Sequence, residues 1–314
     1  GRVRRIVFVQ QSSMNNFLIV LPGPTGVGKS EVAVEIASHF GIEIISADSR
    51  QFYREMTIGT AVPEPELLER TKHHFIQFIS VREYYSSSLY ERAVLGLLPS
   101  LFRRNGAAIL AGGSGLYIDA VCRGIDDIPD IDPEVRQKYN NKYKAEGIES
   151  LRAALRLTDP EYYARVDLRN HQRIIRALEI FESTGRKYSE FLTSNTAARN
   201  FRIIKTGLAR DRKELYERIN SRVDRMIGKG LEKEARELLS LRGLNPLKSV
   251  GYSEMFDYFE GKISMDEAID LIKRNSRRYA KRQITWWNRD PEITWFHPDN
   301  IRDLIAHIES AMNR

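Results

Sequence analysis

A phosphate-binding loop is the first group of residues whose types and spacing predict chemistry. Its form, G-x-x-x-x-G-K-S/T, is matched by Gly23, Pro24, Thr25, Gly26, Val27, Gly28, Lys29 and Ser30. Glycines let backbone N–H groups turn inward around a phosphate, and a helix that begins behind the loop adds positive potential. Lys29 would neutralise phosphate charge, and the Ser30 hydroxyl would ligate Mg²⁺. The alternative is an ordinary glycine-rich turn, but the motif favours a diphosphate or triphosphate ligand with Mg²⁺ as cofactor.

A carboxylate follows the next expected strand. The apolar run from Ile42 to Ser46 predicts a buried strand, and Asp48 comes just beyond it. Ligands of open α/β sheets bind outside the carboxyl ends of the strands, so Asp48 is a candidate general base or magnesium partner. Asp also commonly caps a helix or a turn. The residue types alone leave these two roles open.

A basic cluster near the C-terminal end predicts contact with a polyanion. No acidic residue interrupts it between Asp270 and Asp290. Five of its members would share one face of a helix and repel one another unless anions lie beside them. They are Arg274, Arg277, Arg278, Lys281 and Arg282. Trp286 and Trp287 offer rings for stacking on unpaired bases, but core packing is the favoured interpretation for both.

The overall composition is typical of a globular protein with one large and one smaller domain. The chain has 314 residues, of which 42% are hydrophobic and 29% charged. Its net charge of +7 gives weak support to a nucleic-acid partner. Cys122 is the only cysteine, which excludes an intramolecular disulfide and a cysteine-cluster zinc site and favours the cytoplasm. His73 and His74 have no closely spaced carboxylate to complete a metal site, so we interpret them as structural or RNA-facing.

No segment predicts a membrane span, because nowhere do about 18 apolar residues follow one another. Residues 1–16 are basic, and their apolar run is too short for a signal peptide. We interpret this stretch as a leader or a remnant, with Met14 as a candidate start.

Strand-like and helical segments alternate along the chain, which predicts an α/β fold with a mostly parallel sheet flanked by helices, as in P-loop NTPases. Strands are expected at 17–21, 42–46, 107–111 and 203–208, and helices at 31–40 and 89–102. Strand-like runs are missing from 126–196, where we predict a smaller, mainly helical inserted domain. The core would then comprise 17–125 and 197–314, with a helical C-terminal part.

Six blocks in this order make the chain similar to the bacterial tRNA dimethylallyltransferases, also called tRNA isopentenyltransferases, along nearly its whole length. They are GPTGVGKS (23–30), SADSRQFYREMTIGT (46–60), GGSGLY (112–117), HQRIIRALEIFESTGRKYS (171–189), RVDRMIGKGL (222–231) and RRYAKRQITWW (277–287). The loop alone is shared with many unrelated nucleotide-binding proteins, whereas the six blocks together are specific. No Cys/His finger follows Trp287, so the chain resembles the bacterial form and not the longer eukaryotic one.

The resemblance implies transfer of a dimethylallyl group from dimethylallyl diphosphate to N6 of adenosine 37, next to the anticodon of tRNA. The loop would hold the donor's diphosphate in place of ATP. The residue matching Asp48 would act as general base toward N6, and the hydroxyl matching Thr25 would lie near the reacting groups. Lys29 and Arg176 complete the implied catalytic set. An adenine amine needs an acceptor for its proton, and diphosphate leaves readily only when its growing charge is neutralised.

The resemblance also implies a set of tRNA contacts. These residues are Asp48, Ser49, Arg50, Gln51, Ser114, Arg136, Gln172, Arg173, Ile174, Ile175, Arg176, Arg277, Arg278, Lys281 and Arg282. The inserted domain would meet the anticodon stem-loop. Without the family match, Arg173 and Arg176 would be a solvated pair or bridged to Glu179. Residues that depart from the family's usual choice are Arg50, Glu55, Val62 and Ser114, the last of which keeps the hydroxyl.

Three other functions use a phosphate loop followed by an aspartate. A nucleoside or small-molecule kinase needs both but leaves the basic helix unexplained. A GTPase-like RNA-binding switch predicts tight GTP binding and no base modification. A transferase acting on free AMP needs neither the helical insertion nor the cationic face. The sequence therefore predicts the tRNA-modifying enzyme, acting as a monomer in the cytoplasm without a membrane partner.

Overall fold

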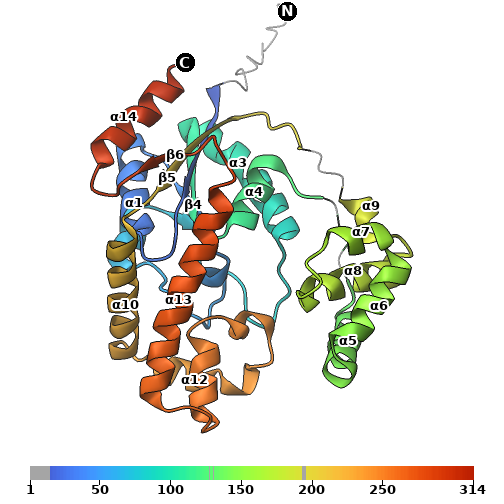
Figure 1. Cartoon of the computed structure of the whole chain (residues 1–314). Helices are drawn as coiled ribbons and strands as arrows, with labels where there is room; N and C mark the ends of the chain where they lie inside the picture. The colour runs from blue at the N-terminus through green and yellow to red at the C-terminus, as the bar shows by residue number, and fades with distance from the viewer. Residues whose placement is uncertain (1–14, 127, 130, 193–195) are drawn as a thin grey trace, which may run out of the picture. The chain divides into compact units, whose positions relative to one another are not determined.

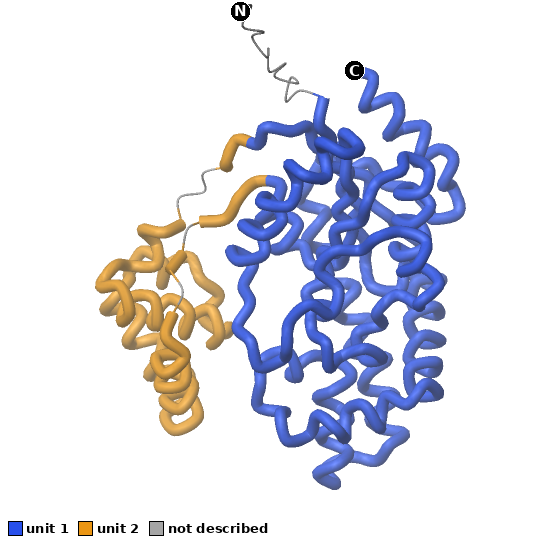
Figure 2. Tube along the Cα trace, turned by 180° about the vertical axis from the view of Figure 1, so that it is seen from behind, with its two compact units in different colours: residues 1–122, 199–314 blue, residues 123–198 orange. Residues whose placement is uncertain are grey.

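The computed structural model describes residues 15–126, 128–129, 131–192 and 196–314 (Figure 1). The chain divides into two compact units. Unit 1 runs up to residue 122 and resumes at 199, and unit 2 covers 123–198, where the sequence suggested 126–196 (Figure 2). The leader suggested for residues 1–16 lies, as far as residue 14, outside the described residues. Among the described helices, none has both the length and the apolar character needed to cross a membrane.

One sheet forms the centre of unit 1. Within the described residues it has six strands, all parallel, in the order β3-β2-β4-β1-β5-β6. The strands are β1 (Phe17–Pro22), β2 (Ile44–Ser46), β3 (His73–His74), β4 (Ala107–Gly112), β5 (Arg202–Leu208) and β6 (Thr294–Phe296). This confirms the predicted α/β class. The sequence analysis did not identify β3 and β6, because two or three residues are too few to show a periodic pattern.

Side chains of the central strand alternate between two cores. On β1, Phe17, Ile19 and Leu21 belong to one core, whereas Leu18 and Val20 belong to the other. All five are buried because helices cover both faces of the sheet. The first face carries α1 (Lys29–Phe40), α10 (Arg212–Gly228) and α14 (Ile301–Met312), and the opposite face carries α3 (Ser87–Asn105) and α4 (Gly115–Arg123).

A third core lies among the helices that follow β5. Tyr252, Met255 and Ile272 are fully buried in it and pack with Met56 and Val81 from the first part of the chain. The helices that build it with α10 are α11 (Leu231–Glu237), α12 (Tyr252–Phe259) and α13 (Met265–Trp287). Shorter elements of unit 1 are η2 (Ser49–Phe52), α2 (Pro65–Arg70), η3 (Leu239–Leu241) and η4 (Asn245–Lys248). The C-terminal helices are therefore packed against the segment that follows Asp48.

The two tryptophans at the end of α13 are structural. Trp287 is 2% exposed in the core under α3 and α4. Trp286 packs on the same core, and its Nε1 donates a hydrogen bond to Asp119 Oδ2 at 2.9 Å. The core interpretation of both tryptophans is confirmed.

The regular elements of unit 2 are all helices within its described residues. Its helices are α5 (Pro133–Glu146), α6 (Ile148–Thr158), α7 (Pro160–Arg165), α8 (His171–Thr184) and α9 (Tyr188–Phe191). Ile174 and Ile175 of α8 are 0% and 4% exposed and pack against Leu151 and Leu155 of α6. Both isoleucine side chains therefore pack in the core of unit 2, and the contact with tRNA that the resemblance implies for residues 174 and 175 stays a prediction.

Asp159 joins two helices of unit 2. It is 1% exposed, and its Oδ1 accepts hydrogen bonds from Tyr162 N at 3.0 Å and from Ser189 Oγ at 2.7 Å. Its Oδ2 accepts a third from Ser189 N at 2.8 Å. A buried carboxylate of this kind stabilises the fold because each donor would otherwise be buried without a partner.

Replacing Asp159 with alanine should loosen α7 and α9 by leaving the donors on Tyr162 and Ser189 unpaired, at a cost of about 3 kcal/mol. We expect faster backbone hydrogen exchange in residues 160–165 and 188–191, with no change in β1 and β4. Asp167→Ala, which removes an exposed carboxylate of the same unit, is the matched control. Equal exchange in the two variants would contradict the role given to Asp159.

Candidate active site

The predicted phosphate-binding loop connects the end of β1 to the start of α1. Gly26, at φ 83°, and Gly28, at φ 102°, adopt left-handed backbone that favours glycine. A Cβ at Gly26 would also lie 2.8 Å from Ile219 Cγ1 of α10. Lys29 Nζ donates to Pro24 O at 2.8 Å, so the lysine folds back across the loop. Strand, glycine turn and helix have the arrangement that the motif requires.

The parallel register brings the loops after β1, β2 and β4 to one edge of the sheet. The last residue of β1 pairs with Gly112 of β4, and the last residue of β2 pairs with Ala111. A Cβ at Gly112 would lie 2.2 Å from Ala47 O, so only glycine allows the loops after β2 and β4 to approach this closely. Asp48, two residues beyond β2, therefore stands at the same edge as the phosphate-binding loop.

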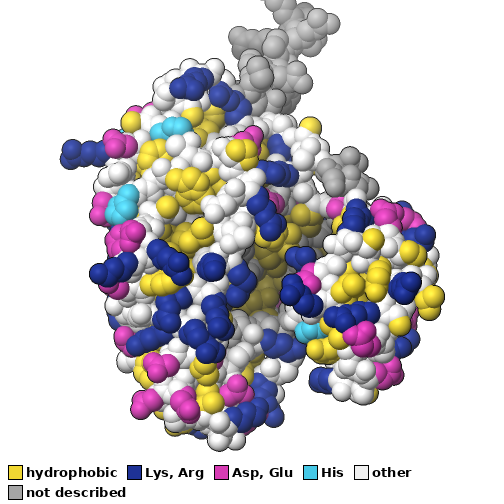
Figure 3. Space-filling view, in the orientation of Figure 1, with side chains coloured by type: hydrophobic (Ala, Val, Ile, Leu, Met, Phe, Trp, Pro, Cys, Tyr) yellow, Lys and Arg dark blue, Asp and Glu magenta, His cyan; other side chains and the backbone are white. Residues whose placement is uncertain are grey.

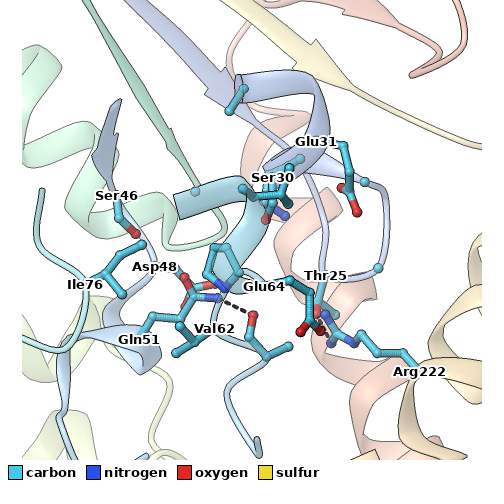
Figure 4. A pocket seen from close by; sticks show the side chains of 18 of the residues that line it. Thr25, Ser30, Glu31, Ser46, Asp48, Gln51, Val62, Glu64, Ile76 and Arg222 are labelled. Atoms are coloured by element: carbon cyan, nitrogen blue, oxygen red, sulfur yellow. Dashed lines mark hydrogen bonds between the residues drawn. The ribbon is translucent and has the colours of Figure 1, made fainter. Parts of the chain in front are cut away.

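A cavity of about 870 Å³ opens at this edge. Thr25, Lys29, Ser30 and Asp48 all line it, and Figure 4 shows Thr25, Ser30 and Asp48 around the same space. Asp48 Oδ1 accepts from Arg50 N at 3.2 Å, which confirms a capping role at η2. Asp48 Oδ2, by contrast, accepts no hydrogen bond from the described residues. One carboxylate thus caps a turn and still offers an acceptor to the cavity.

Burial lowers the pKa of two cations beside the cavity. It lowers the pKa of Lys29 to about 8, an effect that the carboxylate of Asp48 opposes and the positive charge of Arg222 increases. Burial likewise lowers the pKa of Arg222 to about 10, with the nearby Arg50 as the second cause. Positive charge is therefore less stable here than in water, and an anion in the cavity would stabilise the protonated forms.

Arg222 is a site residue to which the sequence analysis gave no role. Its Nη2 donates to Thr25 Oγ1, and its Nε has no hydrogen-bond partner among the described residues. Three cations of α10, at positions i, i+4 and i+7, line the cavity. They are Arg218, Arg222 and Arg225. The block 222–231 carried this signal, but cations on a helix indicate a solvated face as readily as a binding site.

The residues next to Asp48 form hydrogen bonds within the protein. Ser49 N donates to Ser114 Oγ at 3.0 Å, and the two hydroxyls are also 3.0 Å apart. Arg50 Nη2 donates to the carbonyls of residues 59 and 250. Gln51 is 8% exposed, and its Nε2 donates to the carbonyls of residues 60 and 61. Of these four residues, only Gln51 lines the cavity, and the contacts of all four with tRNA stay predictions.

The basic face of α13 is only partly free. Arg278, Lys281 and Arg282 are exposed, as is Arg274. Arg277 is half-buried and donates from Nη1 to Asn220 Oδ1 at 2.7 Å. Figure 3 shows Lys and Arg side chains gathered over the region of α10 and α13. Because most of these cations face solvent, they remain available to phosphates.

A buried carboxylate organises the predicted contact residues of unit 2. Glu179 is 0% exposed, and it accepts from Arg136 Nε at 2.8 Å and from Arg176 Nη1 at 2.9 Å. The bridge between Arg176 and Glu179, the alternative weighed from the sequence, is therefore present. Gln172 and Arg173 are exposed. The catalytic role implied for Arg176 stays a prediction.

The adjacent histidines have partners inside unit 1. His74 Nε2 lies 2.6 Å from Glu43 Oε2, and His73 Nδ1 lies 2.8 Å from Thr71 O. Burial lowers the pKa of His73. Both contacts support the structural interpretation. Within the part of the chain that is described, no three His, Cys, Asp or Glu residues are grouped so as to hold a metal ion.

Comparison with known proteins decides the family. Residues 51–290 match the family described as IPP transferase. The chain belongs to this family. It is 51% identical over 298 residues to a tRNA dimethylallyltransferase 1 of Phocaeicola vulgatus, with 95% of this chain and 99% of that protein covered. It is 53% identical over 293 residues to a tRNA dimethylallyltransferase 2 of Porphyromonas gingivalis, with 93% and 98% covered.

Solved structures agree with the family membership. The full-length tRNA isopentenylpyrophosphate transferase of Bacillus halodurans is 35% identical, with a TM-score of 0.68 and with 95% of this chain and 97% of that one covered. A eukaryotic dimethylallyltransferase acting on tRNA is 23% identical, with a TM-score of 0.74 over 90% and 74% of the two chains, and shares the fold. The resemblance indicated by the sequence and the P-loop-like fold are both confirmed.

The pKa of Lys29 gives a prediction for anion binding. Because Lys29 is protonated below about pH 8 and neutral above it, the affinity for inorganic pyrophosphate should fall as pH rises through and beyond this value. Loss of one charged hydrogen bond corresponds to roughly ten- to hundredfold weaker binding. Calorimetric titration between about pH 6.5 and about pH 9 would measure the effect, because this range includes the pKa of Lys29 and stays below that of Arg222.

Lys29→Arg is the matched control, because a guanidinium stays charged over this range and the probe titrates identically in both proteins. The wild-type affinity should fall relative to that of the variant only on the alkaline side. A constant ratio of the two affinities would show that Lys29 does not contact the anion.

Proposed function

We propose that the chain is a tRNA dimethylallyltransferase, which transfers a dimethylallyl group from dimethylallyl diphosphate to N6 of adenosine 37 of tRNA. The products are N6-(dimethylallyl)adenosine and diphosphate. The observation that carries the proposal is that Asp48 lines one cavity with five residues of the phosphate-binding loop, in a chain so similar to tRNA dimethylallyltransferases. The five are Thr25, Gly26, Gly28, Lys29 and Ser30. The reaction needs a proton acceptor and an anion site within reach of each other, and this cavity offers candidates for both.

The donor's diphosphate would lie against the phosphate-binding loop. The 12-residue helix α1 begins directly behind it at Lys29, so its first N–H groups add positive potential at this point. Lys29 and Arg222 supply positive charge, and burial has already desolvated both groups. As the C–O bond breaks and charge grows on the leaving diphosphate, such desolvated cations stabilise it more strongly than solvated ones would.

The acceptor's amine would face Asp48. The nitrogen of N6 forms a bond to the allylic carbon while the bond from that carbon to the diphosphate oxygen breaks. N6 then carries an extra proton, which Asp48 accepts. Oδ1 is held by the backbone of Arg50 and Oδ2 is not, so Oδ2 is the atom that we assign to proton transfer.

Thr25 would connect the two ends of the reaction. Its Oγ1 accepts a hydrogen bond from Arg222, so its own hydroxyl proton is left to donate elsewhere. An oxygen of the bound diphosphate is the acceptor that we assign to it. This arrangement would let Arg222 act on the leaving group both directly and through the threonine.

Mg²⁺ fits the same place. The Ser30 hydroxyl and the Asp48 carboxylate both line the cavity, and they are the hard oxygen donors that Mg²⁺ prefers. We assign Ser30 as the residue that would hold the ion. When bound, the ion would supply further neutralisation of the diphosphate charge.

The tRNA would use both units. We assign its phosphates to Arg278, Lys281 and Arg282 of α13, which are exposed, and the anticodon stem-loop to unit 2, where Gln172 and Arg173 are exposed on α8. An amide such as that of Gln172 suits a base edge, because it carries a donor and an acceptor together. A monomeric state and a cytoplasmic location stay predictions.

A kinase would use a similar loop and carboxylate, so the test must separate two reactions. Incubation with dimethylallyl diphosphate and unmodified tRNA should give N6-(dimethylallyl)adenosine, detected by mass spectrometry of the digested nucleosides. Incubation with ATP and free nucleosides should transfer no phosphate. Consumption of ATP without prenylation would replace the proposal with the kinase.

Asp48→Asn should lower kcat by about 10²- to 10⁴-fold, because the amide keeps the cap at η2 but cannot accept a proton. Affinity for tRNA should stay within about threefold, since the backbone hydrogen bond survives. Asp257→Asn, an exposed carboxylate paired with Lys262, is the control. Turnover by the Asp48 variant near the wild-type rate would refute the general-base assignment.

Arg278→Ala combined with Arg282→Ala should weaken tRNA binding and reduce the slope of log affinity against log salt by about 1.4 to 1.8, or 0.7 to 0.9 for each lost phosphate contact. Filter binding across a salt series measures this slope. The charge-matched control removes Arg236 and Lys262, whose positive charges are held by carboxylates. An unchanged slope in the α13 variant would exclude these arginines from the interface.

A further inference from the structure

We propose that Gln283 of α13 is a positioning residue for this reaction, and that its single amide sets the geometry of Thr25 relative to the loop that follows β4. The proposal rests on the function proposed above, because Thr25 and Asp48 matter through the chemistry assigned to them. It adds a role to a helix whose basic residues, in the sequence, predicted contact with RNA.

The amide of Gln283 is bonded at both ends. Its Oε1 accepts from Thr25 N at 2.8 Å, and its Nε2 donates to Gly113 O at 2.8 Å. The side chain is 6% exposed, so water offers little alternative to either bond. One planar group from residue 283 thus joins the loop after β1 to the loop after β4, across 258 and 170 positions of the sequence.

The glycine at position 113 shows how tightly this contact is built. A Cβ there would lie 2.5 Å from Gln283 Nε2 and 3.8 Å from Asp48 Oδ2. Any larger residue would have to displace the amide. Gly113 thus lies against both the glutamine amide and the carboxylate to which we assign proton transfer.

A glutamine amide meets the demands of both partners. The side chain must present one acceptor to an N–H and one donor to a carbonyl, which an amide does and a carboxylate does not. Asparagine is shorter by one methylene, and methionine has the length but neither a donor nor a strong acceptor. The identity of residue 283 is therefore set by the two groups that it joins.

Thr25 is consequently held from two sides. Its backbone is fixed by Gln283 from α13, and its hydroxyl is fixed by Arg222 from α10. A displacement of about 1 Å in a group of this kind can lower a rate by about 10²-fold even when binding is unchanged. A change at Gln283 would therefore lower kcat and weaken diphosphate binding. The exposed cations that we assign to tRNA would not be affected.

Two variants separate positioning from general support of the fold. Gln283→Met removes both hydrogen bonds at nearly constant volume and should lower kcat about 100-fold, with KM for tRNA within about twofold of wild type. Gln283→Glu keeps the acceptor for Thr25 but sets an anionic oxygen against Gly113 O. Thr285→Ala is the control, because this residue of the same helix is exposed and its hydroxyl donates to Lys281 O as its one hydrogen bond within the described part of the chain.

The pH dependence of Gln283→Glu gives a readout that a loss of stability would not produce. When protonated, the glutamic acid again donates to Gly113 O and accepts from Thr25 N, so it reproduces glutamine. Its kcat, divided by the wild-type kcat at the same pH, should rise as pH falls from 8 toward 5, roughly the range in which such a carboxyl titrates. The charged groups around the amide, Asp48, Lys29 and Arg222, are present in both proteins, so their own titration largely cancels.

Inorganic pyrophosphate provides a test that does not require the reaction. Gln283→Met should bind it about tenfold more weakly, because a displaced Thr25 would lose one hydrogen bond to a charged oxygen of the anion. Thr285→Ala should bind it as wild type does. If wild-type protein fails to prenylate tRNA, the proposed function is wrong, and pyrophosphate binding still decides the role of Gln283.

The proposal would be overturned if kcat for Gln283→Met were within threefold of wild type. Both values of kcat are to be divided by the concentration of active sites, counted in a single-turnover experiment. A kcat ratio for Gln283→Glu that does not change with pH would also overturn the proposal. Lower thermal stability with an unchanged kcat and pyrophosphate affinity would show that the residue only supports the fold.

Discussion

Two desolvated cations, Lys29 and Arg222, share a cavity with the carboxylate of Asp48, and the rest of the site is arranged around this charge. Burial lowers the pKa of both cations, so each is less stable when protonated than it would be in water. A protein retains such groups when a ligand supplies the missing negative charge. The diphosphate of a prenyl donor would do so, and its departure is the step that benefits most from positive charge held in place beforehand.

The parallel sheet explains why these groups meet. Because β1, β2 and β4 are neighbours with the same direction, the loops at their carboxyl ends converge. The phosphate-binding loop and Asp48 come from the first of these loops and the second. Helices from the last third of the chain then complete the site: α10 contributes Arg222, and α13 contributes Gln283. A functional centre that begins near residue 23 is finished by residues beyond 220.

Much of this centre could be predicted from the sequence where the signal is local. The loop at 23–30 is recognisable because its glycines, lysine and serine are consecutive, and Asp48 stands out because it follows a short apolar run. The same local patterns gave four of the strands, although the run at 42–46 begins two residues before β2 does. Burial of Trp286 and Trp287 also followed from their size and chemistry.

What the sequence could not supply is contact over long separations. Gln283 looks like one more polar residue of a basic helix until its two partners are seen 170 and 258 positions away. Ile174 and Ile175 lie between Arg173 and Arg176 in the sequence, yet the helix turns both toward the core of unit 2. Arg50 and Gln51 come two and three residues after Asp48 and resemble ligand contacts, but in the fold Arg50 Nη2 and Gln51 Nε2 donate to backbone carbonyls. Pairings of this kind depend on which loops the sheet brings together.

The most direct test of the central claim is a crystal structure with a tRNA anticodon stem-loop and a non-reactive sulfur analogue of dimethylallyl diphosphate. We expect the diphosphate on residues 24–30 and the N6 atom of the extruded adenine about 3 Å from the Asp48 carboxylate. A diphosphate bound elsewhere, or an N6 atom more than about 6 Å from that carboxylate and so out of reach even through one water molecule, would contradict the assignment.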